Sequence, residues 1–298
     1  TWHKDAVKAI DTEQRRVELV EGEPLSYDFL IIASGTEIRP DMIDGMMGPG
    51  WHESVFDFYT LEGAKALQKA LANFEGGRLV INVVEMPIKC PVAPLEFAFL
   101  ADWYLTKRGI RDKTELVYAT PLDGAFTKPL ASKTLGYLLE NKGIQVETEF
   151  MTGEVDSEKN LIRSYDEREV PYDLLVTIPP HMGAGFLEDT DLADELAFVA
   201  TDPHTLAAKN AERVFVIGDA TDLPSSKAGS VAHFQADLMT ENILRAIEGK
   251  ELEPTFDGHS NCFVETGHGK AMLIDFNYET EPLPGQFPIP GVGPLPLL

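Results

Sequence analysis

The chain has 298 residues, of which 44% are hydrophobic, and is therefore long enough for one large or two ordinary domains with cores of their own. Its 49 acidic and 25 basic residues give a formal net charge of −24, which argues against nucleic-acid binding because that function needs a basic surface. The 2 cysteines and 7 histidines lack the spacing of metal ligands, so we expect no metal site.

Two segments share an order of features that predicts a repeated α/β unit. Residues 25–40 and 170–185 each contain a Tyr-Asp pair, an apolar run and a turn rich in glycine or proline. Alternating charged and β-branched residues precede both segments, which is typical of an antiparallel hairpin that has one wet face and leads into a buried strand. We therefore expect two similar units, the first of which lacks its opening strand and helix.

The second unit is expected to begin at Gly77, with a buried strand over residues 79–84 and a helix over residues 95–105. In a dinucleotide-binding βα unit, the turn between strand and helix carries glycines that let the backbone approach a pyrophosphate. Here the turn carries prolines and Cys90 instead. The sequence therefore predicts that this unit does not bind NADH.

A third buried strand is predicted over residues 213–217, followed by a helix that begins after Gly229 and ends at Ala246. The strand ends in the tripeptide Gly218-Asp219-Ala220. A glycine allows close approach of the backbone, and a carboxylate at the carboxyl end of a strand can accept hydrogen bonds from the hydroxyls of a ligand. The alternative is a turn without a ligand.

The local setting of Cys90 favours redox chemistry. Cys90 precedes a predicted helix, whose dipole favours a thiolate, and Lys89 adds a positive charge beside it. Cys262 begins a predicted strand of a hairpin that turns at Gly267. For either residue, the alternative is a small buried side chain that only packs.

These motifs together resemble those of a known family. "YDFLIIASGT" and "VFVIGDATDLPSSKAGSVAHFQA" resemble flavin-domain motifs of the two-dinucleotide-domain flavoprotein disulfide reductases. More narrowly, "KCPVAPLE" and "SNCFVETG" resemble the two cysteine motifs of the sulfide:quinone oxidoreductases and of the related flavoprotein subunit of flavocytochrome c sulfide dehydrogenases. The resemblance extends over residues 17–298. It implies an α/β fold class with two Rossmann-like three-layer domains, one FAD-binding and incomplete, the other a degenerate NAD-type domain.

The resemblance also implies a domain organisation in four segments. Residues 1–52 would form the first part of the FAD-binding domain, and residues 53–198 the second Rossmann-like domain with the first redox cysteine. Residues 199–250 would complete the FAD-binding domain, and residues 251–298 would form the hairpin of the second cysteine and a proline-rich tail. The amino-terminal GxGxxG fingerprint of the family has no counterpart here, so we expect a fragment without it.

The activity that the resemblance implies is FAD-dependent oxidation of sulfide to sulfur or polysulfide, with the electrons passed to a membrane quinone. A persulfide relay between Cys90 and Cys262 would carry it, and Glu96 matches a family carboxylate that handles protons. The alternative role of Glu96 is a helix-start carboxylate favoured by the dipole. Two other functions stay open: the flavocytochrome c flavoprotein and a non-catalytic scaffold. Which cysteine contacts the flavin is also open.

By the same resemblance, FAD would be bound by Gly35, Thr36, Gly218, Asp219, Ala220 and Lys227. Asp219 would accept hydrogen bonds from the ribityl chain. Lys227 would lie at the edge of the isoalloxazine or quinone and stabilise negative charge there, and its alternative is a solvated surface lysine.

The last residues, "EPLPGQFPIPGVGPLPLL", contain too much proline for a helix or a central strand. In the family this region leads into an amphipathic segment that docks on the membrane. We therefore expect a parent enzyme that is monotopic and membrane-associated, through a C-terminal segment that this soluble fragment lacks. A homo-oligomer is compatible with the resemblance.

Overall fold

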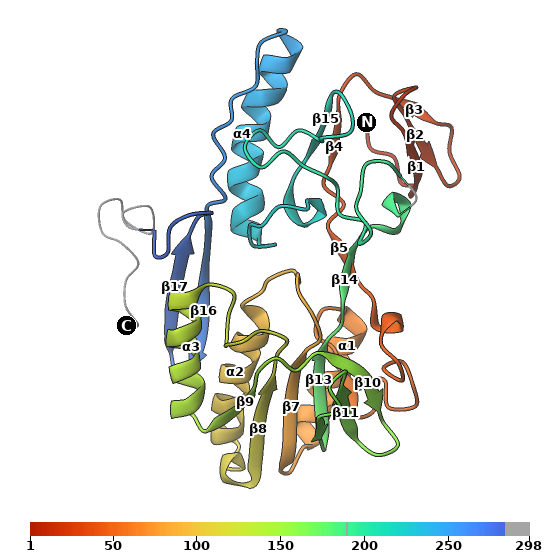
Figure 1. Cartoon of the computed structure of the whole chain (residues 1–298). Helices are drawn as coiled ribbons and strands as arrows, with labels where there is room; N and C mark the ends of the chain where they lie inside the picture. Colours follow the sequence, from red (N-terminus) through yellow and green to blue (C-terminus); the bar gives the residue numbers. More distant parts are fainter. Residues whose placement is uncertain (189, 284–298) are drawn as a thin grey trace. The chain divides into compact units, whose positions relative to one another are not determined.

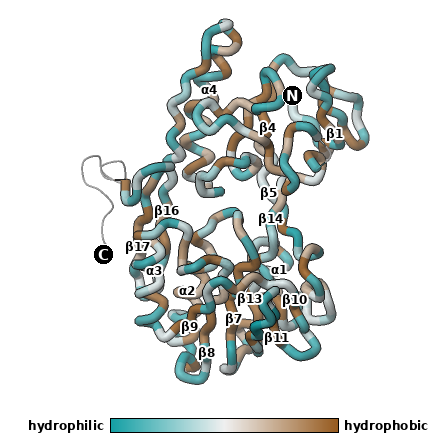
Figure 2. Tube along the Cα trace, in the orientation of Figure 1, coloured by the Kyte–Doolittle hydropathy of each residue, from teal (hydrophilic) through white to brown (hydrophobic). Residues whose placement is uncertain are grey.

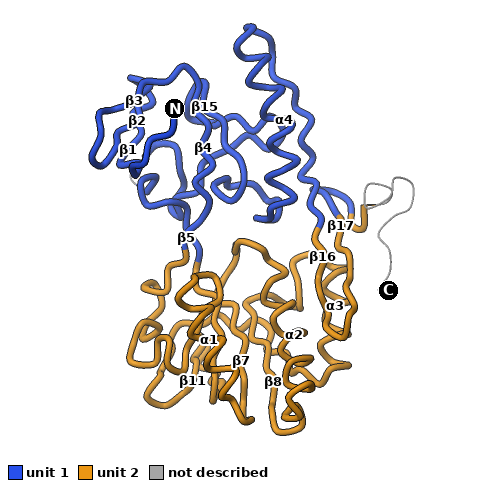
Figure 3. Tube along the Cα trace, turned by 180° about the vertical axis from the view of Figure 1, so that it is seen from behind, with its two compact units in different colours: residues 1–37, 181–261, 276–280 blue, residues 38–180, 262–275, 281–298 orange. Residues whose placement is uncertain are grey.

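The computed structural model describes residues 1–188 and 190–283, and the chain forms two compact units (Figures 1 and 3). Of the described residues, unit 1 contains 1–37, 181–261 and 276–280, and unit 2 contains 38–180, 262–275 and 281–283. The proline-rich tail expected over residues 281–298 falls mostly outside the described residues.

The boundaries of the compact units differ from those of the expected domains. The chain passes from unit 1 to unit 2 after residue 37 and returns at residue 181, whereas the expected domain boundaries lie after residues 52 and 198. The two crossings are neighbours because β5 (Thr36–Ile38) pairs with β14 (His181–Gly183). The four-segment domain organisation remains a prediction.

Unit 2 contains a five-stranded sheet whose neighbouring strands are all parallel, in the order β6-β13-β7-β8-β9. Its strands are β6 (Val55–Phe56), β7 (Gly77–Val83), β8 (Thr114–Ala119), β9 (Ile144–Glu147) and β13 (Leu174–Ile178). Strands buried on both faces are rich in apolar residues, and β7, β8 and β13 are mainly apolar where they are buried, apart from Asn82 and Thr177 (Figure 2). The strand predicted over residues 79–84 is therefore confirmed as β7.

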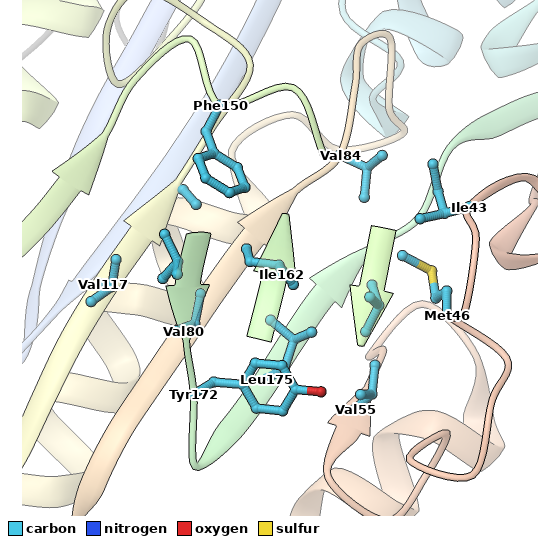
Figure 4. Close-up of a cluster of buried hydrophobic side chains, with 13 residues drawn as sticks. Ile43, Met46, Val55, Val80, Val84, Val117, Phe150, Ile162, Tyr172 and Leu175 are labelled. Atoms are coloured by element: carbon cyan, nitrogen blue, oxygen red, sulfur yellow. The ribbon is translucent and has the colours of Figure 1, made fainter. Parts of the chain in front are cut away.

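Helices and a second sheet cover the parallel sheet of unit 2. The helices are α1 (Leu61–Asn73), α2 (Ala93–Lys107) and α3 (Pro129–Asn141). The second sheet is antiparallel and consists of β10 (Thr152–Asp156), β11 (Leu161–Ser164) and β12 (Glu169–Pro171). Figure 4 shows the core between the two sheets, where Val80 and Val117 of the parallel sheet meet Ile162 of the antiparallel one. Unit 2 thus has the expected three layers.

Unit 1 repeats part of this plan. An antiparallel sheet of β1 (Val7–Asp11), β2 (Arg16–Leu19) and β3 (Leu25–Ser26) precedes β4 (Leu30–Ile32), which pairs in parallel with β15 (Val214–Val216). The long helix α4 (Gly229–Ile247) follows β15 and a single 3-10 turn over Gly218–Ala220. In both units a three-stranded antiparallel sheet leads into a parallel strand, so the repeat predicted from the sequence is confirmed.

A hairpin closes the described part of the chain. β16 (Ser260–Gly267) and β17 (Lys270–Phe276) form a two-stranded sheet, and the turn lies at Gly267, as predicted. Within residues 1–188 and 190–283, short 3-10 helices cover Pro40–Met42, Arg111–Lys113, Gly185–Leu187 and Gly218–Ala220. Among the described residues, no helix combines the length and the apolar character that crossing a membrane requires.

Candidate functional site

Cys90 lies in the loop between β7 and α2, three residues before the helix begins, and is half-buried. Its φ of +50° lies in the left-handed region, which costs energy for a residue with a side chain. Two hydrogen bonds hold the loop in place: the Tyr59 hydroxyl donates to the carbonyl of Lys89 at 2.9 Å, and the Ala93 N–H donates to the carbonyl of Cys90, also at 2.9 Å. Such externally maintained strain is common at functional sites.

The hairpin that carries the second cysteine packs along α2. The N–H of Glu265 in β16 donates to Oε1 of Glu96 at 2.9 Å. Farther along β16, Gly267 lies so close to the helix that a Cβ there would be 2.9 Å from Cβ of Trp103 and 3.1 Å from the carbonyl oxygen of Phe99. Positions 96, 99 and 103 lie on one face of a helix, so this face of α2 receives the hairpin.

Cys262 is half-buried near the start of β16, and its thiol is strongly perturbed. Burial, with smaller contributions from the charges of Cys90 and Glu96, raises the pKa of Cys262 to about 12. These electrostatic effects require the three side chains to lie near one another, although two of them are far apart in sequence. The structure therefore brings together the three residues that the sequence analysis assigned to catalysis.

Glu96 combines a structural contact with an unusual titration. Burial raises the pKa of its carboxyl, the hydrogen bond from the Glu265 N–H lowers it, and the charge of Glu265 raises it. A carboxyl whose pKa moves toward neutrality is suited to proton exchange at physiological pH. Glu96 lies in the first turn of α2, where a negative charge is favoured by the helix dipole, and its Oε1 also accepts a hydrogen bond from the hairpin.

The residues expected to bind FAD lie in unit 1, where β4 and β15 end side by side. Gly35 and Gly218 have φ values of +73° and +69°, which glycine adopts readily, and nothing lies within 4 Å of a Cβ placed on Gly35. The N–H of Gly218 donates to Oε1 of Gln235 at 2.7 Å, and Nε2 of this buried amide has no partner. An orphaned buried donor beside open backbone fits a polar cofactor with acceptor groups.

The remaining expected FAD-binding residues surround this turn. Asp219 is half-buried within the 3-10 turn, Ala220 is fully buried behind it, and Thr36 begins β5. Their side chains offer a carboxylate and a hydroxyl on the carboxyl side of the paired strands, which is where open α/β sheets bind ligands. Nothing in these positions conflicts with a bound dinucleotide.

Lys227 is buried, so the alternative of a solvated surface lysine is wrong. Its ammonium donates to the carbonyls of Asp219 at 2.8 Å and of Thr221 at 2.7 Å, and lies 3.8 Å from the centroid of the Phe198 ring. Burial lowers the pKa of Lys227 to about 8. The lysine therefore holds the turn expected to face the cofactor, while its place at an isoalloxazine or quinone edge remains a prediction.

Sequence reasoning missed Tyr59 and Gln235. Tyr59 carries no local signal, because its role comes from a loop distant in sequence. Gln235 does carry one: it lies between Val231 and Met239 on the buried face of α4, where a polar side chain needs a partner. As for metals, the described residues contain no group of three or more His, Cys, Asp or Glu side chains that could hold an ion.

Comparison with known proteins gives relatives but no matching family model. The mitochondrial sulfide:quinone oxidoreductase of Mus musculus is 25% identical over 288 residues, which are 95% of this chain and 64% of that protein. This chain thus spans somewhat less than two thirds of that relative.

Solved structures share the fold. The sulfide:quinone oxidoreductase of Aquifex aeolicus superposes with a TM-score of 0.76 at 19% identity, covering 92% of this chain and 67% of that one. A chain in the structure of the Tetrahymena thermophila mitochondrial ATP synthase also gives a TM-score of 0.76, at 23% identity, covering 93% of this chain and 70% of that one. These likenesses confirm the α/β fold class with Rossmann-like domains.

Proposed function

Because the chain is related over nearly its whole length to the sulfide:quinone oxidoreductases, we propose that it belongs to a flavoenzyme that oxidises sulfide and passes the electrons to a quinone. The observation that carries the proposal is the cluster of Cys90, Cys262 and Glu96 within unit 2. Two sulfurs from distant parts of the chain, with a half-buried carboxyl beside them, are the groups that thiol–disulfide chemistry with proton transfer requires.

The unequal settings of the two cysteines support an order of events. Hydrosulfide attacks the sulfur of Cys262 in a Cys90–Cys262 disulfide, a new S–S bond forms, and the old one breaks. Cys90 departs as a thiolate with the electron pair, and Cys262 keeps a persulfide. A thiol of lower pKa leaves faster, and the raised pKa of Cys262 makes it a poor leaving group. The start of α2 lies just beyond Cys90 and stabilises its negative charge.

Glu96 handles the proton in this scheme. When hydrogen sulfide rather than hydrosulfide arrives, its proton must leave as the S–S bond forms. The carboxylate of Glu96 accepts that proton, and burial raises the pKa of this carboxyl, which makes it a better base than an exposed glutamate. The Glu265 N–H fixes one carboxylate oxygen and leaves the other for proton exchange.

FAD, when bound, supplies the two-electron acceptor that links the cysteine sulfurs to the quinone. FAD would lie close to the backbone at Gly35, Thr36 and Gly218. Asp219 would accept hydrogen bonds from hydroxyls of the ribityl chain of FAD. The unpartnered Nε2 of Gln235 would donate to one of its acceptor atoms. Lys227 would keep the Gly218–Ala220 turn in shape, since its ammonium binds two carbonyls there.

The proposed partners of the enzyme are sulfide and a quinone, and a peripheral membrane contact through the C-terminal region is part of the proposal. The mouse relative is named as mitochondrial. A non-catalytic scaffold remains a second candidate, because a fold by itself does not establish catalysis.

Serine substitutions separate these functions. In the flavin-loaded protein, Cys90→Ser and Cys262→Ser should each slow flavin reduction by sulfide at least roughly a hundredfold, because serine cannot form a persulfide. Both variants should still fold and bind FAD, because serine differs little from cysteine in volume. Dithionite should still reduce the flavin, and the reduced flavin should still reduce the quinone, because neither step uses a cysteine. Near-normal reduction by sulfide in either variant would contradict the relay. A wild-type flavin that sulfide does not reduce would favour the scaffold.

A further inference from the structure

We propose that the tip of the β16–β17 hairpin, seated on α2 through Gly267, is the positioning element that holds Cys262 beside Cys90 and Glu96. The seat itself is a structural proposal, and only its catalytic meaning rests on the proposed function. All the residues involved belong to unit 2.

The two glycines of the hairpin tip have different tasks. Gly267, His268 and Gly269 have φ values of +74°, +55° and +71°, so the turn places all three in the left-handed region. Both glycines meet this backbone demand. A Cβ on Gly269 would have nothing within 4 Å, whereas a Cβ on Gly267 would collide with Trp103 and the carbonyl of Phe99. Only Gly267 is therefore required for the close approach to the helix.

The surface of α2 that receives the tip is itself firmly held. The ammonium of Lys107 lies over the Trp103 ring, 3.6 Å from its centroid. The centroids of the Trp103 and His268 rings are 6.4 Å apart. Nε2 of His268 is 3.7 Å from Oδ2 of Asp102. This largely buried carboxylate binds the guanidinium of Arg111 at 2.7 Å and the ammonium of Lys142 at 3.0 Å.

Two contacts fix the register of β16 on α2. One is the seat at Gly267, and the other is the Glu265 N–H on Glu96, about 7 Å back along the strand at about 3.3 Å per residue. Cys262 lies three residues beyond the second contact, or about 10 Å. A strand held at two points can neither slide nor swing on the helix, so the place of Cys262 is set by these contacts.

The pleat of β16 makes this register decisive. Cys262 shares a strand face with Val264 and Thr266, which are 0% and 4% exposed. Phe263 belongs to the opposite face and is 57% exposed. Because side chains alternate along a strand, a slip of one residue would turn Cys262 outward and Phe263 inward. Releasing the tip would therefore separate Cys262 from Glu96 and expose its thiol to water.

The test compares Gly267→Ala with Gly269→Ala, since both substitutions impose similar backbone strain and only the first collides with α2. The first readout is the pH profile of Cys262 alkylation by iodoacetamide, resolved by peptide mass spectrometry. The second is the equilibrium of the two thiols with oxidised glutathione, in which one disulfide and two reduced glutathiones form. Circular dichroism and thermal melting check that each variant is folded.

We expect Gly267→Ala to alkylate at Cys262 at least roughly tenfold faster near pH 8, because a solvated thiol ionises more readily. Its Cys90–Cys262 disulfide should be at least roughly tenfold less favoured against glutathione, since the effective concentration of one thiol near the other falls. Gly269→Ala should match the wild type in both readouts. Trp103→Ala, which removes the indole without adding an atom, should shift both in the same direction if Gly267→Ala does not fold.

Equal behaviour of the two glycine variants would overturn the seat, because turn strain alone would then explain the result. A different outcome concerns the proposed function: if the wild-type thiols never couple in glutathione while Gly267→Ala still changes the alkylation of Cys262, the seat stands and the two-cysteine relay fails.

Discussion

Replacing Glu96 by glutamine tests two roles of the carboxyl beside the sulfurs. Its charge should raise the pKa of the Cys262 thiol, and its carboxylate should act as the base that accepts a proton from hydrogen sulfide. The pKa of Cys262 rises from an ordinary 9.0 to about 12, so near pH 8 roughly one thiol in ten thousand is ionised instead of one in ten. Glu96 is the smallest of the three causes, after burial and Cys90. It therefore supplies less than a third of the increase, and its removal should raise the ionised fraction by less than about tenfold.

The same substitution should lower the turnover of sulfide. Glutamine keeps an oxygen for the Glu265 N–H, so the hairpin contact survives, but an amide cannot take up a proton. Loss of a general base costs on the order of a hundredfold or more in rate. Glu96→Gln should thus alkylate faster at Cys262, by a few-fold in a pH-dependent iodoacetamide assay, while flavin reduction by sulfide becomes slower.

Glu85→Gln is the matched control for this experiment. Burial raises the pKa of the Glu85 carboxyl as it does that of Glu96, and Glu85 precedes Cys90 in the same loop. Glu85 is not among the groups that act on Cys262, so the alkylation profile should not change in this variant. Unchanged alkylation in Glu96→Gln, or a loss of turnover as large in Glu85→Gln, would refute the reasoning.

Two further predictions concern the cofactor and the electron donor. Lys227→Met should weaken FAD binding at least roughly tenfold in a flavin titration, because the carbonyls of Asp219 and Thr221 lose their donor. Burial lowers the pKa of Lys227 from 10.5 to about 8, so between these pH values the unfolded chain keeps a proton that the folded protein has lost. The free energy of unfolding in urea should therefore rise with pH in the wild type relative to Lys227→Met. The rise between about pH 8 and 10.5 should reach up to roughly 3 kcal/mol. A flat difference would contradict the burial of the charge. NADH should neither bind unit 2 nor reduce the flavin, because the loop before α2 carries Cys90 and prolines where a phosphate site needs glycines; anaerobic bleaching of the flavin by NADH would contradict this.

The parts of the fold that the sequence predicted are those with a strong local pattern. β7 and the Gly218–Ala220 turn follow from a continuous apolar run and from a glycine at the end of a strand. The burial of Lys227 was left open, because a lysine among serines, alanine and glycine is indistinguishable by sequence from a solvated loop residue. Its burial depends on Phe198 and on two carbonyls of another turn, which no local pattern encodes.

The seat of the hairpin lies beyond sequence analysis for a similar reason. In the sequence, Gly267 and Gly269 both resemble turn glycines, and no nearby residue indicates that Gly267 contacts α2. The distinction appears only when a Cβ is placed on each of them, since one position is open and the other is filled by the helix.

The same limit applies to the two cysteines. The resemblance leaves them as equivalent partners in a relay, because a motif records which residues are present and not what surrounds them. Their surroundings differ, although both are half-buried: Cys90 sits before a helix in a strained loop, while Cys262 lies on the inner face of a strand beside the half-buried carboxyl of Glu96. A sulfur that ionises with difficulty is a poor leaving group and a good place for a persulfide to remain. This asymmetry supports hydrosulfide attack at Cys262 and departure of Cys90. Equimolar sulfide added to the wild-type disulfide without oxygen, followed by iodoacetamide and peptide mass spectrometry, tests this order. The persulfide should be trapped on Cys262 and the alkylated thiol on Cys90, whereas a persulfide trapped on Cys90 would contradict it.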